Sequence, residues 1–314
     1  MKRFLLATTL ALAAASSAAQ AGVSPIVAPQ ELEHLRTAPN VRIIDIRPAD
    51  LYAKNHIPGA LSAPYAAWRG PANNPGQLPE LTELAKLVQR LGLDEHTHAV
   101  VVSTGENTTD FGAAARVYWT MKYLGLEQLS ILNGGMQLWR SAKLPEDQAA
   151  AQVAPSTYQP VVNPDILATR ADILTQIDNP KARLVDARPT AFFTGQVKAP
   201  TAAVPGTIRN AVNIEHSVWF KPDSTEIVSA AQAKQIAAER FPELVDDTIA
   251  FCNTGHWAAT DWFALSELAG LPNVRMYPES LADWTNTAEA LPMDNTPSRS
   301  AQLLEKLKGA FTFN

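Results

Sequence analysis

Short apolar runs alternate with helical patterns along most of the chain, and this alternation occurs twice. The β-rich runs of the first half are "RIIDI", "HAVVVS" and "LSIL", and their counterparts in the second half are "RLVDA", "DTIAF" and "VRMY". Strands that alternate with helices are typical of a parallel sheet with helices on both faces. The pattern therefore predicts an α/β protein that consists of two copies of one duplicated unit.

Polar motifs repeat at matching places in the two halves. Each half has Asp-x-Arg-Pro after its first strand and an apolar-Pro-Gly motif further on ("HIPGA" and "VPGT"). The repeat pairs Asp45 with Asp186, Arg47 with Arg188, Ser103 with Cys252 and Trp139 with Trp284. Since each copy is long enough to bury its own core, we expect two domains, residues 22–143 and 165–314, joined by a Pro/Ala-rich exposed linker at 144–164.

The first 21 residues have the layout of a secretory signal peptide. A basic start (Lys2, Arg3) precedes an apolar run and the small-x-small pattern at residues 19–21. We expect residues 1–21 to be removed on export to the periplasm. No later run of about twenty apolar residues occurs, so no membrane anchor is expected after cleavage. The net charge is −5 and no basic run stands out, which gives nucleic-acid binding little support.

Cys252 is the only cysteine of the chain and stands where a predicted strand ends. In a parallel α/β sheet, ligands bind beyond the carboxyl ends of the strands. The loop "NTGHW" that follows can curl over the sulfur, with Gly255 permitting a turn and successive backbone N–H groups forming an anion-binding nest. The start of the next helix adds positive potential. These effects favour thiolate over thiol, so we expect an exposed, nucleophilic Cys252 rather than a buried structural thiol.

In this order, and twice, these motifs resemble those of the tandem rhodanese-like sulfurtransferases. The resemblance rests on the repeated Asp-x-Arg, "HIPGA", "VPGT", "CNTGHW", "GGMQLW" and "ESLADW". It implies a catalytically silent N-terminal domain, with Ser103 in place of cysteine, and a catalytic C-terminal domain. It also implies that Cys252 carries a persulfide and moves sulfane sulfur from a donor such as thiosulfate to cyanide or a thiol. No metal or organic cofactor is implied.

The resemblance also assigns supporting residues around the thiol. Backbone N–H groups of the loop would hold the charge of the persulfide, and Asp186 and Arg188 would form an ion pair that supports the loop or touches substrate. The loop residues are Asn253, Thr254, Gly255, His256 and Trp257.

Two cations that are common in the family are missing from this sequence. The loop has no arginine or lysine, and Phe192 stands where an arginine often lies four residues after Arg188. His256 could compensate in part as imidazolium at mildly acidic pH. "CNTG" does not match the Cys-Gly-Ser/Ala-Gly loop of the mercaptopyruvate branch, so the sequence favours thiosulfate as the donor.

Three other functions compete with an enzymatic sulfurtransferase. A non-catalytic persulfide carrier that takes sulfur from a partner protein would use the same loop, and the sequence leaves it open. A phosphatase would need an arginine closing the loop, and none follows Cys252 before Arg275. A thiol-disulfide oxidoreductase would need a second cysteine. His96 and His98 have no further ligands nearby and are expected at the surface, not on a metal.

Overall fold

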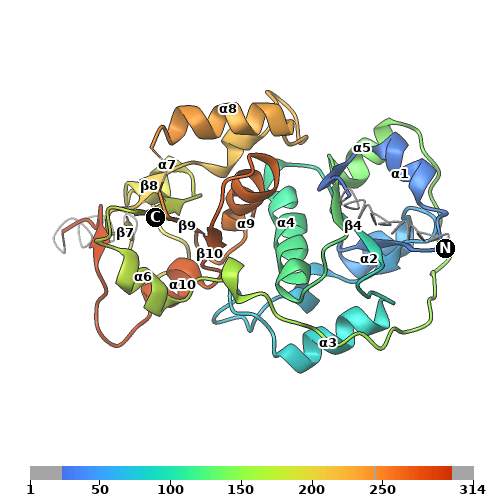
Figure 1. The fold of residues 1–314 in the computed structure, drawn as a ribbon, viewed down its shortest axis with the longest axis horizontal. Helices are drawn as coiled ribbons and strands as arrows, with labels where there is room; N and C mark the ends of the chain where they lie inside the picture. Colours follow the sequence, from blue (N-terminus) through green and yellow to red (C-terminus); the bar gives the residue numbers. More distant parts are fainter. Residues whose placement is uncertain (1–22, 244, 299–314) are drawn as a thin grey trace, which may run out of the picture.

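The computed structural model describes residues 23–243 and 245–298. The predicted signal peptide, residues 1–21, lies outside the described residues. Two α/β units follow each other along the chain and lie side by side in Figure 1.

The N-terminal domain is built on a five-stranded parallel sheet in the order β1-β5-β4-β2-β3. Its strands are β1 (Ile26–Val27), β2 (Val41–Asp45), β3 (Leu61–Ser62), β4 (His98–Val102) and β5 (Leu129–Leu132). Its helices are α1 (Pro29–Leu35), α2 (Ala49–Lys54), the 3-10 turn η1 (Tyr65–Trp68), α3 (Leu81–Arg90), α4 (Thr108–Tyr123) and α5 (Gly135–Ser141). Successive residues Ile43 and Ile44 belong to two different apolar clusters, because side chains alternate between the faces of a strand and helices cover both faces.

The C-terminal domain repeats this plan with a four-stranded parallel sheet in the order β10-β9-β6-β8. Its strands are β6 (Ala182–Asp186), β8 (Val212–Asn213), β9 (Asp247–Phe251) and β10 (Val274–Met276), and β7 (Thr207–Ile208) pairs antiparallel with β11 (Met293–Asp294). Its helical segments are η2 (Pro164–Ile166), α6 (Arg170–Gln176), α7 (Thr190–Phe193), η3 (His216–Trp219), α8 (Ala230–Arg240), α9 (Trp257–Trp262), η4 (Phe263–Leu268) and α10 (Ser280–Trp284).

The predicted fold class is confirmed, and all six apolar runs form strands within a residue of their expected bounds. The helix after Cys252 changes its winding in its second half. Its first part, α9, is α-helical, and Gly270, with a positive φ of 70°, follows the end of the whole helix. It continues as the π-helical η4, in which Phe263, Ala264, Leu265 and Leu268 are buried.

The two domains share one apolar core where α4 packs against α9 and η4 (Figure 1). The ring of Tyr118 on α4 meets Phe263 edge to face, with ring centroids 5.0 Å apart. At the rim of this contact, Glu267 accepts hydrogen bonds from Tyr118 Oη at 2.6 Å and from Lys122 Nζ at 2.8 Å. The N-terminal domain is therefore in direct contact with the helix that follows Cys252.

The linker lies along the N-terminal domain and is irregular apart from Asp147, which forms an isolated bridge with His56, and Pro164, which begins η2. Most of its residues are exposed or partly buried, but Tyr158 is buried and donates a hydrogen bond to the carbonyl of Leu124 at 2.8 Å. The expected connector is thus attached to the first domain at this point.

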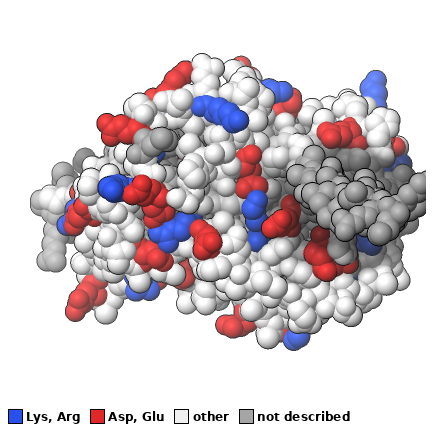
Figure 2. Space-filling view, viewed as in Figure 1, with Lys and Arg blue, Asp and Glu red and all other residues white. Residues whose placement is uncertain are grey.

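Charged residues of both signs are interspersed on the face shown in Figure 2. The largest patches of one sign there comprise only a few side chains. Among the described residues, no helix is both long enough and apolar enough to cross a membrane.

Candidate active site

Cys252 directly follows β9, at the carboxyl end of a central strand of the second sheet. Its backbone N–H donates a hydrogen bond to Ser280 Oγ at 3.0 Å, and its carbonyl accepts one from the N–H of Leu281 at 3.1 Å. The Ser280 hydroxyl in turn donates to the carbonyl of Tyr277 at 2.8 Å. The start of α10 therefore fixes the backbone on which the thiol is mounted.

The loop after Cys252 uses its carbonyls, and not its N–H groups, in hydrogen bonds with other described residues. The carbonyls of Thr254 and Gly255 accept hydrogen bonds from arginine side chains, at 2.9 Å and 3.4 Å. The backbone N–H groups of residues 253–256 have no acceptor among the described residues. Gly255 has a φ of 68°, and a Cβ there would lie 2.3 Å from the carbonyl oxygen of Pro278, so only glycine fits. Such a loop can offer its N–H groups to an anion on the sulfur.

The arginines that hold the loop come from the N-terminal domain. Arg69, which follows η1, donates through Nη2 to Thr254, and Arg116 of α4 donates through Nη1 to Gly255. Neither forms an ion pair with a described carboxylate. The sequence analysis missed both. Arg116 carried a usable signal, because it is a lone cation in the apolar stretch 111–121 of a helix. Arg69 had none, since only the fold brings it to the loop.

His256 is also held by the N-terminal domain. Its Nδ1 lies 3.0 Å from the hydroxyl of Tyr65, and its Nε2 lies 2.7 Å from the carbonyl of Thr109. Burial lowers the pKa of His256 to about 4, and the positive charge of Arg69 acts in the same direction. The expectation that His256 supplies an imidazolium at mildly acidic pH is therefore wrong. The two arginines supply positive charge at the loop instead.

The exposure expected of Cys252 also needs correction. The residue is only 1% exposed and belongs to the apolar core shared by the two domains. The physical reason is the N-terminal domain, which covers the loop through the contacts of Tyr65, Arg69 and Arg116. A reactive sulfur at this place is shielded from bulk water, which strengthens any electrostatic interaction with it.

Asp186 and Arg188 form a buried ion pair at the edge of the site. The carboxylate and guanidinium are joined by several hydrogen bonds, the shortest 2.6 Å between Arg188 Nη2 and Asp186 Oδ2. Arg188 Nη1 also lies 3.4 Å from Asn253 Oδ1, which ties the pair to the loop. Asp45 and Arg47 form the same pair in the first domain at 2.6 Å.

Trp257 begins α9 and contacts both domains. Its ring stacks on His216 with centroids 4.9 Å apart and meets Phe192 edge to face at 5.9 Å. Its indole N–H donates to Thr109 Oγ1 at 3.2 Å. Phe192, which stands where the family often has an arginine, thus packs beside the loop, and Arg188 lies over its ring at 5.9 Å.

The loop after Ser103 in the N-terminal domain has the same backbone frame and different chemistry. The carbonyls of Ser103 and Thr104 accept hydrogen bonds from the N–H groups of Met136 and Gln137, at 2.9 Å and 3.0 Å, as Cys252 and its neighbour do in the second copy. Here, however, the N–H of Glu106 donates to the Asp110 carboxylate at 2.8 Å. A carboxylate already occupies part of this nest, which disfavours a second anion.

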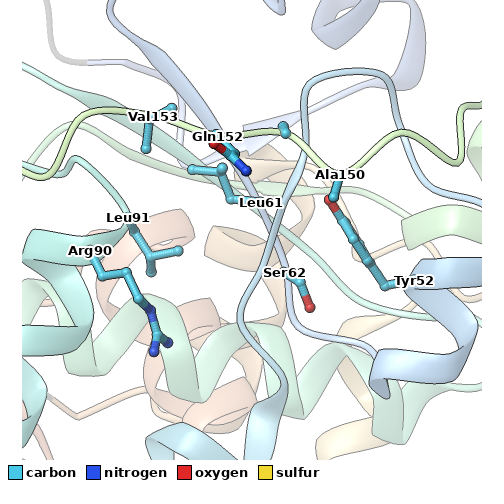
Figure 3. A pocket seen from close by; sticks show the side chains of 9 residues that line it. Tyr52, Leu61, Ser62, Arg90, Leu91, Ala150, Gln152 and Val153 are labelled. Atoms are coloured by element: carbon cyan, nitrogen blue, oxygen red, sulfur yellow. The ribbon is translucent and has the colours of Figure 1, made fainter.

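One cavity of about 330 Å³ lies between the linker and the N-terminal domain (Figure 3). Tyr52, Ser62 and Arg90 line it together with residues 150–153, and none of its lining residues belongs to the loop around Cys252. Among the described residues, no cluster of three or more histidine, cysteine, aspartate or glutamate side chains could hold a metal ion. Of the two histidines expected at the surface, His96 is exposed, whereas His98 is buried in β4, where its Nε2 lies 2.8 Å from Ser130 Oγ.

The fold and the site define a two-domain α/β protein with one cysteine above the second sheet, followed by a loop whose N–H groups have no acceptor in the part of the chain that the structure describes. The rhodanese-like domain model matches residues 28–142 and 169–287. The chain therefore belongs to the rhodanese-like family, and the predicted resemblance is confirmed.

Three relatives illustrate the similarity. The chain is 30% identical over 262 residues to a Haloferax volcanii protein named "Putative thiosulfate sulfurtransferase", covering 80% of this chain and 88% of that one. It is 28% identical to the 3-mercaptopyruvate sulfurtransferase of Escherichia coli K12, covering 82% and 92%. It is also 28% identical to the sulfur carrier protein TtuD of Thermus thermophilus, covering 81% and 90%.

Among solved structures, the 3-mercaptopyruvate sulfurtransferase SseA of Escherichia coli superposes with a TM-score of 0.71 at 25% identity, covering 82% of this chain and 99% of that one. These relatives support the predicted class, a protein that transfers sulfane sulfur through a cysteine.

Proposed function

We propose that this chain is a sulfurtransferase that carries sulfur as a persulfide on Cys252. The observation that carries the proposal is the loop after Cys252. Its N–H groups at residues 253–256 have no acceptor within residues 23–243 and 245–298, while its Thr254 and Gly255 carbonyls accept hydrogen bonds from Arg69 and Arg116. A terminal persulfide sulfur is such an anion, and hydrogen bonds to a charged acceptor are stronger than those to a neutral one.

The reaction has two displacement steps. The Cys252 thiolate attacks the outer sulfur of thiosulfate, the S–S bond of the donor breaks, and its electron pair leaves with sulfite. The enzyme then holds Cys252–S–S⁻. An acceptor such as cyanide attacks the outer sulfur, takes it as thiocyanate and returns the thiolate. Charge and electrons balance without an oxidant or a cofactor, and each step is easier than direct transfer.

Thiosulfate is the donor that the loop sequence favours. "CNTG" differs from the loop of the mercaptopyruvate branch, and the Haloferax volcanii relative is named for the thiosulfate reaction. Other relatives are named for 3-mercaptopyruvate, so both donors belong in one experiment. Export to the periplasm, from the sequence pattern of residues 1–21, is part of the same proposal.

Intact-mass spectrometry before and after each donor tests the proposal, with Cys252→Ser as the control. We expect thiosulfate to add one sulfur atom to the wild type, cyanide to remove it, and the control to stay unchanged. Since the chain has one cysteine, the added mass reports on that residue alone. Unchanged mass with both donors would contradict the proposal for small donors.

A persulfide carrier is the second candidate, favoured by the similarity to TtuD. Steady-state turnover separates the two functions. An enzyme forms thiocyanate continuously from thiosulfate and cyanide, whereas a carrier that needs a protein donor forms none from these small molecules.

A further inference from the structure

Arg116 is a buried cation that has no salt-bridge partner among the described residues. Its side chain is 0% exposed, and it forms no ion pair with any carboxylate in residues 23–243 and 245–298. Nη2 donates to the carbonyl of Gly76 at 2.8 Å and Nη1 to that of Gly255 at 3.4 Å, while Nε has no partner among these residues. Burying a charge without a partner is costly, so such an arginine calls for an explanation.

The guanidinium remains charged at neutral pH even though burial lowers its pKa to about 9. The acidic groups close enough to interact with it are Tyr65, Cys252 and Glu279. Burial raises the pKa of Tyr65 and keeps that phenol neutral, and Glu279 accepts a hydrogen bond of 2.6 Å from Asn74 and forms no ion pair with Arg116. The sulfur of Cys252 is the acidic group that lies on the same loop as the Gly255 carbonyl to which Arg116 donates.

The position of Arg116 is fixed by both domains. A Cβ on Gly255 would lie 2.5 Å from Arg116 Nη1, so the guanidinium fills the space that the glycine leaves. The aromatic face of Trp119, one helical turn away, lies 5.4 Å from the guanidinium carbon and holds its other side. These contacts hold the guanidinium beside the Gly255 carbonyl of the Cys252 loop.

We infer that Arg116 is a positioning residue of the N-terminal domain that supplies, from behind the Gly255 carbonyl, the positive charge that stabilises the thiolate and the persulfide of Cys252. The inference rests on the proposed function and deepens it. It gives the catalytically silent domain a role in the chemistry, and it explains how a loop without arginine or lysine stabilises a sulfur anion.

Other charged or titratable groups also face the site and have to stay constant in a test. They come from every element packed on the loop: Tyr65 and Arg69 at η1, His256 at the start of α9, the pair Asp186–Arg188 at β6, His216 on η3, and Glu279 before α10.

The ionisation of Cys252 can be measured directly, without any sulfur donor. Thiolate absorbs in the ultraviolet, and because the chain has a single cysteine, the difference between each protein and its Cys252→Ser version reports on this thiol alone. Arg116→Gln removes the charge, but its amide can still donate a hydrogen bond to the Gly255 carbonyl. Arg116→Lys keeps a positive charge but loses the planar arrangement of N–H donors of the guanidinium. The matched control is Arg47→Lys, because Arg47 is also a buried arginine but is paired with Asp45.

We expect the titration midpoint of Cys252 to rise by about one pH unit or more in Arg116→Gln, as for the loss of a nearby opposite charge. It should stay close to wild type in Arg116→Lys and in the control. Equal midpoints in wild type and Arg116→Gln would overturn the inference. If Arg116→Gln does not fold, Arg116→Met, which fills a similar volume without charge, decides: a raised midpoint supports a role for the charge, and an unchanged one overturns it.

The outcome is independent of the proposed function. A shifted thiolate midpoint together with no sulfur transfer from any donor would contradict the sulfurtransferase and leave the role of Arg116 intact. Sulfur transfer with an unshifted midpoint would support the sulfurtransferase and contradict the role of Arg116.

Discussion

Ser280 Oγ accepts a hydrogen bond of 3.0 Å from the backbone N–H of Cys252, and Ser280 itself has a positive φ of 53°. The matching position of the first copy is Gly135, with a φ of 56°, so the backbone has the same conformation in both domains. Glycine adopts this conformation without strain, whereas serine does not. The backbone of the second copy is therefore strained at Ser280, and the Ser280 hydroxyl satisfies the buried N–H of Cys252.

Replacing Ser280 separates the strain from the hydrogen bond. Ser280→Ala keeps the strain and leaves the N–H of Cys252 buried without a partner, so we expect a loss of about 1–3 kcal/mol in the free energy of unfolding. Ser280→Gly loses the same hydrogen bond but relieves the strain, so its loss should be smaller by about 1 kcal/mol. Urea unfolding of the two variants measures the difference. Equal stabilities would mean that the backbone at Ser280 is not strained.

Gly255 and Gly270 form a matched pair for testing the loop. Both have positive φ, 68° and 70°. A Cβ at Gly255 would collide with Pro278 and Arg116, whereas one at Gly270 would have no atom of the described residues within 4 Å. Gly270→Ala should lose about 1 kcal/mol of stability and keep its sulfur transfer. Gly255→Ala should lose more stability and slow persulfide formation at least about tenfold, because the loop has to move. Similar activities in the two variants would contradict the role of the loop.

Most of the fold could be predicted from sequence because its signals are local. The strands around residues 43, 100 and 249 are apolar runs, and the repeat reveals the second copy even where spacing differs. The thiol could be placed at a strand end for the same reason. The burial of Cys252 by the N-terminal domain could not be predicted, because Arg69 and Tyr65 reach the loop only where one domain packs on the other. Apart from the lone cation Arg116 in an apolar helix, the sequence patterns within each domain carry no information about that contact.

The role expected of His256 failed for a related reason. Its partners Tyr65 and Thr109 lie more than a hundred residues away along the chain, so neither its burial nor its neutral state was visible from the loop sequence. Local sequence identifies the loop, while the chemistry of its side chains depends on the other domain.

Burial of His256 predicts a pH-dependent stability. Its pKa is about 4 in the folded chain and about 6.5 in an unfolded one. The unfolded state therefore binds the proton first as pH falls. The stabilising contribution is complete above about pH 6.5 and is lost progressively between there and about pH 4. Thermal unfolding of His256→Gln should show a weaker dependence on pH in this window. His96→Gln, at an exposed histidine, is the control and should follow the wild type.

The duplicated ion pairs allow a comparison of structure with activity. Arg47 and Arg188 are buried alike and pair with an aspartate at 2.6 Å, but only Arg188 reaches the loop, at Asn253. Arg47→Met and Arg188→Met should each cost about 3–5 kcal/mol, because each leaves a buried carboxylate unpaired. Among molecules that remain folded, only Arg188→Met should form the Cys252 persulfide more slowly. Equal rates would place Arg188 outside the site.

Phe192 offers a way to add the cation that the loop lacks. Its ring lies 5.9 Å from both Trp257 and the Arg188 guanidinium, beside the start of α9. Phe192→Arg should place a second guanidinium there and lower the KM for thiosulfate by up to about tenfold, the equivalent of roughly 1.4 kcal/mol. Salt screens such an interaction, so the gain should shrink as ionic strength rises.

Phe192→Leu removes the ring without adding charge and serves as the control. Steady-state kinetics with thiosulfate at low and high salt distinguish the two substitutions. If Phe192→Leu lowers KM as much as Phe192→Arg, the ring restricts access and charge is irrelevant. If Phe192→Arg leaves KM unchanged, Arg69 and Arg116 already provide all the positive charge that the donor uses, and the side chain at position 192 does not set the affinity for anions.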